Sequence, residues 1–98
     1  NELIVKAFYY DSISVYPVPC ENYYLVISIM DNPNEPFNDR FYKYMYMDSV
    51  KNTLNVRFTK DNGLMFGRYI ISVSKDSLEE NIELLYKGGS VQLDLIMK

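Results

Sequence analysis

Residues 23–30 read Tyr-Tyr-Leu-Val-Ile-Ser-Ile-Met, and this stretch decides the fold. Aromatic and β-branched residues dominate it, and an extended chain would place apolar side chains on both of its faces. A proline- and asparagine-rich segment, residues 31–39, follows directly and would end a strand. We therefore expect residues 23–30 to form a buried β-strand.

Alternating apolar and polar residues predict further strands on both sides of this run. They lie at residues 3–9, 41–47, 54–58, 67–74 and 91–95. Many short strands broken by Gly, Pro and Asn turns, such as Asp61-Asn62-Gly63, indicate an all-β fold, an antiparallel β-sandwich. The 98 residues suit one domain with one core, spanning 1–98, and whether it is excised from a longer protein stays open.

One short helix, or a helical turn, is predicted before the last strand, at residues 77–86. Ser77 and Glu80 have the spacing of a capping box, and Gly88 would end the helix. The apolar side of this helix would consist of Leu78, Ile82 and Leu85. Because so short a helix is marginal, a loop with one turn is the alternative.

The composition argues against catalysis. The chain has no histidine, so the usual general base near neutral pH and the commonest zinc ligand are missing. Cys20 is the single cysteine, so neither a Cys-His pair nor an internal disulfide can form. The acidic residues Glu79, Glu80 and Glu83 are interpreted as a solvated helix face. We predict that the chain is not an enzyme and holds no cofactor.

Charge and cysteine use bear on partners and location. The net charge is -3 and the basic residues are scattered singly, whereas proteins that bind nucleic acid gather them on one face. We therefore expect no nucleic-acid binding. A single cysteine and the lack of an N-glycosylation sequon favour an intracellular location, cytoplasmic or peripheral to a membrane.

Residues 36–41, Pro-Phe-Asn-Asp-Arg-Phe, resemble the Pro-x-Trp-Asn-Glu-x-Phe motif of the C2-domain family, a calcium- and lipid-binding β-sandwich. Residues 54–58, the Phe66-Gly67 pair and residues 90–96 are similar to later strands and turns of that family, in the same order. The resemblance covers most of the chain and implies a C2-like sandwich.

Where that family has an Asp-x-Asp pair for calcium, this chain has Phe58 and Lys60, with Asp61 nearby and Asp11 in the first loop. Calcium takes about six to eight oxygen ligands, so these residues make a poor cage. The resemblance therefore implies a calcium-independent member without a metal site.

The resemblance also implies that two loops, residues 13–17 and 64–65, lie at the same end of the sandwich. Exposed apolar side chains at such a tip mark a protein or membrane contact. The candidate contacts are Tyr16, Pro17, Leu64 and Met65. For Ile13 and Val15 we favour the alternative that they tuck under their own loop.

A row of tyrosines is a second candidate surface. Tyr42, Tyr44 and Tyr46 would share one face of the 41–47 strand, and tyrosine is enriched in interface cores. The alternative is that this face covers the core while the methionines point outward, and periodicity leaves the choice open.

The sequence thus favours a non-enzymatic, calcium-independent C2-like interaction module, with protein contact or peripheral membrane targeting as its role. A protein partner is the preferred reading. One alternative is a self-assembling scaffold, a homo-oligomer joined through an exposed sheet edge. The other is a small acidic inhibitor from a virus or mobile element, which would present carboxylates to a basic cleft.

Overall fold

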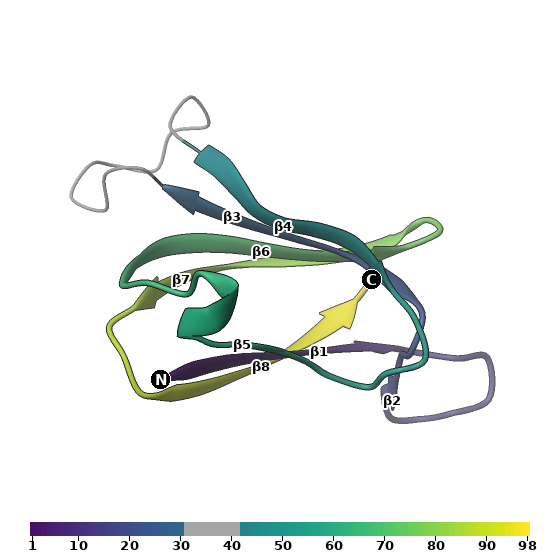
Figure 1. Cartoon of the computed structure of the whole chain (residues 1–98). Helices are drawn as coiled ribbons and strands as arrows, with labels where there is room; N and C mark the ends of the chain where they lie inside the picture. The colour runs from purple at the N-terminus through teal and green to yellow at the C-terminus, as the bar shows by residue number, and fades with distance from the viewer. Residues whose placement is uncertain (31–41) are drawn as a thin grey trace.

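The computed structural model describes residues 1–30 and 42–98, and these residues form β-strands and one short 3-10 helix (Figure 1). The strands are β1 Glu2–Tyr9, β2 Val18–Pro19, β3 Tyr23–Met30, β4 Tyr42–Val50, β5 Val56–Phe58, β6 Gly67–Lys75, β7 Leu78–Tyr86 and β8 Ser90–Met97. The 3-10 helix, η2, covers Lys60–Asn62 and is closed by Gly63, whose φ of 93° is left-handed. The predicted all-β class and the predicted turn at residues 61–63 are confirmed.

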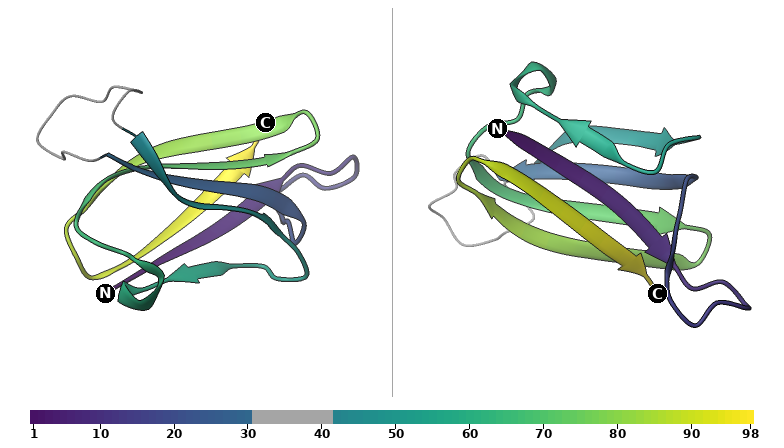
Figure 2. Two further views of the ribbon diagram at one scale, coloured as in Figure 1. Left: turned by 45° about the horizontal axis from the view of Figure 1, so that its top comes forward. Right: turned by 90° about the horizontal axis from the view of Figure 1, so that it is seen from below.

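The strands form two facing sheets, as a β-sandwich requires (Figure 1). In the β1 sheet, β1 pairs with β8 along one side and with β5 and β2 along the other; the β3 sheet has the order β4-β3-β6-β7. Strands β1 and β8 are parallel, from Glu2↔Ser90 to Tyr9↔Met97, and the other described pairs are antiparallel. Figure 2 shows the first and last strands running side by side.

The core lies between the two sheets and follows the alternation of β1. Leu3, Val5 and Ala7 are fully buried, whereas the residues between them are partly exposed. The β3 sheet supplies the opposite wall, and its fully or almost fully buried side chains are Leu25, Ile27, Tyr69, Ile71 and Val73. Burial of apolar side chains on both inner faces is the main stabilising term of such a sandwich.

The helix predicted at residues 77–86 is wrong, because this segment is strand β7. It pairs with β6 along its whole length, from Lys75↔Leu78 to Gly67↔Tyr86. Asp76, with a φ of 53°, turns the chain tightly between the two strands, and Asp tolerates this conformation. A short isolated helix is marginal, so a complete ladder with an existing strand outweighs a weak helical period.

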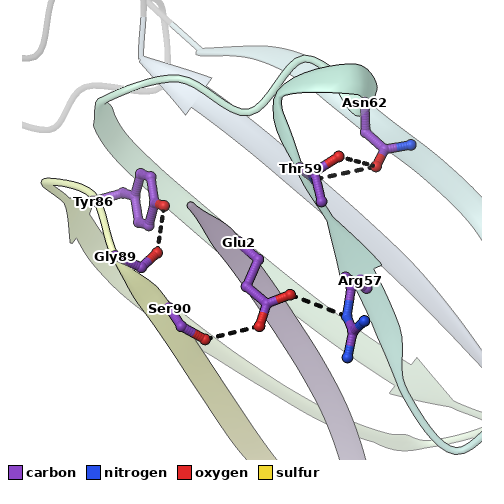
Figure 3. A network of polar contacts seen from close by, with 7 residues as sticks. All are labelled: Glu2, Arg57, Thr59, Asn62, Tyr86, Gly89 and Ser90. Carbon is purple, nitrogen blue, oxygen red and sulfur yellow. Dashed lines mark hydrogen bonds and ion pairs between the residues drawn. The ribbon is translucent and has the colours of Figure 1, made fainter.

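A set of polar contacts holds the start of β1 against the start of β8 and against β5 (Figure 3). Glu2 accepts a hydrogen bond from Ser90 Oγ at 2.9 Å and forms an ion pair with Arg57 Nε at 3.2 Å. The Glu2 N–H donates to the Gly89 carbonyl at 3.0 Å, and Tyr86 OH donates to the same carbonyl at 2.7 Å. These contacts link β1 to β5 on one side and to β8 on the other.

Two buried tyrosines differ in how their hydroxyls are satisfied. The Tyr23 hydroxyl has no hydrogen-bond partner among the described residues, and desolvation by burial, followed by the nearby Cys20, raises the pKa of Tyr23 to about 12. The Tyr69 hydroxyl donates to the Met65 carbonyl at 2.7 Å and accepts from the Met65 N–H at 3.0 Å. The Tyr23 hydroxyl is therefore desolvated without compensation from the described residues, whereas the Tyr69 hydroxyl holds the backbone at Met65 in place.

We expect Tyr23→Phe to leave stability unchanged or raise it by about 1 kcal/mol, because it removes an unpaired buried hydroxyl. The matched variant Tyr69→Phe should lose about 1–3 kcal/mol, because it leaves the Met65 backbone groups unpaired. Urea unfolding followed by circular dichroism measures both. A larger loss for Tyr23→Phe than for Tyr69→Phe would contradict the packing described for these side chains.

Candidate functional site

The loop between β1 and β2, residues 10–17, projects beyond the end of β1 (Figures 1 and 2). Asp11 organises it, because its Oδ1 accepts the Ile13 N–H at 3.1 Å and the Ser14 N–H at 2.6 Å. The loop closes where Tyr9 pairs with Val18. Side chain-to-backbone bonds of this kind are a common way for aspartate to stabilise a turn.

The tip of this loop is the most exposed apolar surface among the described residues. Ile13 is 89% exposed, Val15 86% and Tyr16 79%. The expectation that Ile13 and Val15 tuck under their own loop is therefore wrong. The Asp11 hydrogen bonds shape the backbone of the loop from within, and none of the described strands lies over the tip to cover these side chains.

A pocket of about 230 Å³ lies at the base of the loop and is lined by Phe8, Pro17, Asp94 and Ile96. Pro17 itself is half-buried, so it forms the pocket wall and not the tip. The Asp94 carboxylate is the charged group of this lining, and it accepts a hydrogen bond from Gln92 Nε2 at 3.1 Å. The loop thus combines an apolar tip with a small, mostly apolar pocket.

Lys75 provides a cation near the same end of the sandwich. Its Nζ lies 5.2 Å from the centre of the Tyr9 ring and 3.9 Å from Cys20 Sγ. The thiol is 1% exposed and donates to the Asn22 carbonyl at 3.2 Å, so Cys20 is part of the core. Lys75 comes from β6, far from Cys20 along the chain, so the fold and not the local sequence brings the two together.

The expected meeting of residues 13–17 with residues 64–65 is wrong. Strand β5 pairs with the start of β1, through Leu3↔Phe58, so the segment that follows β5 lies at the opposite end of the sandwich from the β1–β2 loop (Figure 1). Leu64 is buried, at 8% exposed, and so does not offer a contact surface. Met65 is 58% exposed but stands apart from Tyr16 and Pro17.

Of the three tyrosines in the predicted row, the structure describes the side chain of Tyr46 alone. Tyr46 is half-buried, with its ring centre 5.1 Å from that of Phe58 in an edge-to-face contact, and its hydroxyl lies 3.3 Å from Asp48. The side chains of Tyr42 and Tyr44 lie outside the described part of the structure. A register shift places Ile27 opposite Tyr46 and Ser28 opposite Tyr44, and this irregularity interrupts the simple alternation.

The acidic residues considered for calcium do not converge. Asp11 lies in the β1–β2 loop and Asp61 in η2, at opposite ends of the sandwich (Figure 1). Within residues 1–30 and 42–98, no three His, Cys, Asp or Glu side chains are grouped so that they could hold a metal ion. The C2-like motif at residues 36–41 falls outside the described residues.

No family model, curated protein or solved structure matched this chain. Among the residues that the structure describes, there is no helix with the length and apolarity needed to cross a membrane.

The hydrogen bonds from the Ser14 backbone and side chain, followed by that from the Ile13 N–H, hold the pKa of Asp11 below its ordinary value of 3.8. Because the folded-state pKa is lowered, these bonds order the loop at neutral pH and are lost as the pH falls through that pKa. The amide chemical shifts of Ile13 and Ser14 should therefore titrate with a midpoint below 3.8.

Two variants of Asp11 separate its charge from its hydrogen bonding. Asp11→Asn keeps an acceptor, so we expect an ordered loop whose amide shifts no longer titrate. Asp11→Ala removes the acceptor, so the ¹⁵N order parameters of residues 12–16 should fall toward those of a flexible segment, below about 0.6. Unchanged order parameters in Asp11→Ala would show that Asp11 does not organise the loop.

Proposed function

We propose that the chain is a non-enzymatic interaction module, calcium-independent and C2-like, and that it binds a protein partner through the β1–β2 loop. The exposure of Ile13, Val15 and Tyr16 at the tip of a hydrogen-bonded loop carries the proposal. Adjacent apolar side chains left in water at one tip are typical of contact sites. Covering them contributes roughly 25 cal/mol for each Å² of apolar surface removed from water.

The organisation of the loop supports recognition by a preformed surface. Asp11 holds the backbone of the turn, and Pro17 restricts the chain where it returns to β2. A loop that is already ordered loses less conformational entropy when it binds. The pocket lined by Phe8, Pro17 and Ile96 would receive a small apolar group of the partner beside the tip.

Charge favours a protein over an anionic membrane. Peripheral proteins that bind anionic lipids gather several Lys or Arg residues beside their apolar contact. Here Asp11 lies in the loop and Glu21 follows β2, so carboxylates accompany the lysines at this end of the sandwich, among them Lys75 at the base. A net charge of -3 adds to this preference.

We expect the triple variant Ile13→Ser, Val15→Ser and Tyr16→Ser to lose partner binding by at least 100-fold, since each buried apolar side chain contributes about 1.5–3 kcal/mol and about 1.4 kcal/mol corresponds to tenfold. Its stability should change by less than about 0.5 kcal/mol per site, because the side chains are exposed. Quantitative mass spectrometry of proteins retained from a cell lysate identifies candidates, and titration with a purified candidate gives the dissociation constant.

The matched control is Leu54→Ser, which removes an exposed apolar side chain, 45% exposed, from the segment between β4 and β5. It should bind as the unmodified chain does. Equal retention of every protein by the triple variant would overturn the proposal. So would loop-dependent pelleting with phosphatidylserine vesicles in the absence of calcium, which would indicate a membrane contact. Binding that requires added calcium would contradict calcium independence.

A further inference from the structure

Strand β7 forms one edge of the β3 sheet and, among the described strands, pairs with β6 alone. Strand β8, its neighbour across the side of the sandwich, belongs to the other sheet. In the described residues, the two strands are joined by backbone bonds at one place, where Glu79 and Lys98 exchange N–H to carbonyl bonds of 3.2 and 3.1 Å. Beyond that pair, no strand of residues 1–30 or 42–98 pairs with the outer edge of β7.

The direction of the backbone groups follows from this pair. In a strand, alternate residues direct their N–H and carbonyl groups to the same side. Because Glu79 directs its groups toward Lys98, Asn81 and Glu83 direct theirs to the open edge. The Asn81 N–H donates to the Glu80 side chain, to Oε1 at 3.0 Å. A neighbouring carboxylate thus occupies the donor that another strand would use.

An open cleft of about 360 Å³ lies beside this edge, between β7 and β8. Its apolar residues are Ile82, Leu95 and Ile96, and its polar rim comprises Glu80, Asn81, Asp94 and Lys98. Ile82 lies on the same face of β7 as the buried Tyr86, yet it is 37% exposed. The cleft is therefore a place where the interior of the sandwich is incompletely covered.

Around the edge and its cleft, carboxylates outnumber the lysine of the lining, Lys98. Glu79 and Glu83 are exposed on the outer face of β7, and Glu80 and Asp94 line the cleft. A second copy adding through its own β7 would bring these carboxylates together, and like charges oppose such pairing. A basic segment has the complementary charge.

We propose that the free edge of β7 binds an extended segment of a partner protein in which apolar and basic residues alternate. The segment adds a strand beside Asn81 and Glu83 and replaces the Glu80 carboxylate on the Asn81 N–H with its own carbonyl. Its apolar side chains enter the cleft over Ile82 and Leu95, and its basic side chains face Glu83. Asp94 and Ile96 also line the pocket at the base of the β1–β2 loop, but the backbone groups that pair with the segment belong to β7 and not to the loop.

The probe is a fluorescein-labelled peptide of sequence Lys-Val-Lys-Ile-Lys-Val-Lys. The controls are the same peptide with Glu in place of Lys, and a peptide of the same composition without alternation, Lys-Lys-Lys-Val-Ile-Val-Lys. Fluorescence anisotropy should show binding of the alternating basic peptide at least tenfold tighter than of either control. Amide shifts in the ¹⁵N spectrum should change at residues 81–85 and stay constant at residues 12–16, which separates this site from the loop.

Two pairs of variants test the edge itself. Asn81→Pro removes the N–H directed to the open edge and should weaken binding at least tenfold, whereas Asn81→Ala keeps it and should bind normally. Glu83→Lys should weaken binding at least tenfold, whereas Glu21→Lys, which changes the net charge equally at another exposed site, should not. The second pair remains informative if Asn81→Pro does not fold.

The proposal is overturned by equal binding of all three peptides, by equal effects of Glu83→Lys and Glu21→Lys, or by shift changes outside β7 and β8. Lack of binding at millimolar peptide would also overturn it, and the carboxylates would then serve to protect the edge from pairing. A homodimer whose interface maps to β7 would equally contradict it.

Discussion

The pairing of the first strand with the last is the constraint on which the rest of the structure depends. Strand β1 lies between β8 on one side and β5 and β2 on the other, so it is the central strand of its sheet. The parallel ladder from Glu2↔Ser90 to Tyr9↔Met97 brings the first and last strands of the chain together. Leu3, Val5 and Ala7 are fully buried as a result. Without this ladder, the inner face of the β3 sheet would lose its cover.

The same arrangement determines which surfaces are left for recognition. Strand β1 ends at Tyr9, and the following loop extends past the sandwich, so none of the described strands covers the side chains of Ile13, Val15 and Tyr16. Strand β8 belongs to the β1 sheet and meets β7 by backbone bonds only at Lys98 within the described residues, which leaves the edge of β7 open. One proposed contact surface therefore lies beyond the end of the sandwich, and the other lies at its side, where no described backbone bond beyond those of Lys98 joins the two sheets.

Much of the fold was predictable from local pattern, because β3, β6 and β8 carry strong strand signals and turn residues separate them. Strand β7 was not, since Leu78, Ile82 and Leu85 also fit a helical period and only the ladder with β6 decides between the two. The candidate site was predicted in part: Tyr16 and Met65 are exposed, whereas Leu64 is buried and the two loops lie at opposite ends. Non-local strand pairing determines these positions, and a single sequence carries little information about it.

Residue-resolved native-state hydrogen exchange tests the central claim most directly. The amides of Ile4, Lys6 and Phe8, on the side of β1 that faces β8, should exchange only through global unfolding. The amide of Glu83 on the open edge of β7, and those of residues 12–16, should exchange much faster through local fluctuation. Fast exchange along β1, or protection of Glu83 equal to that of β1, would contradict the account.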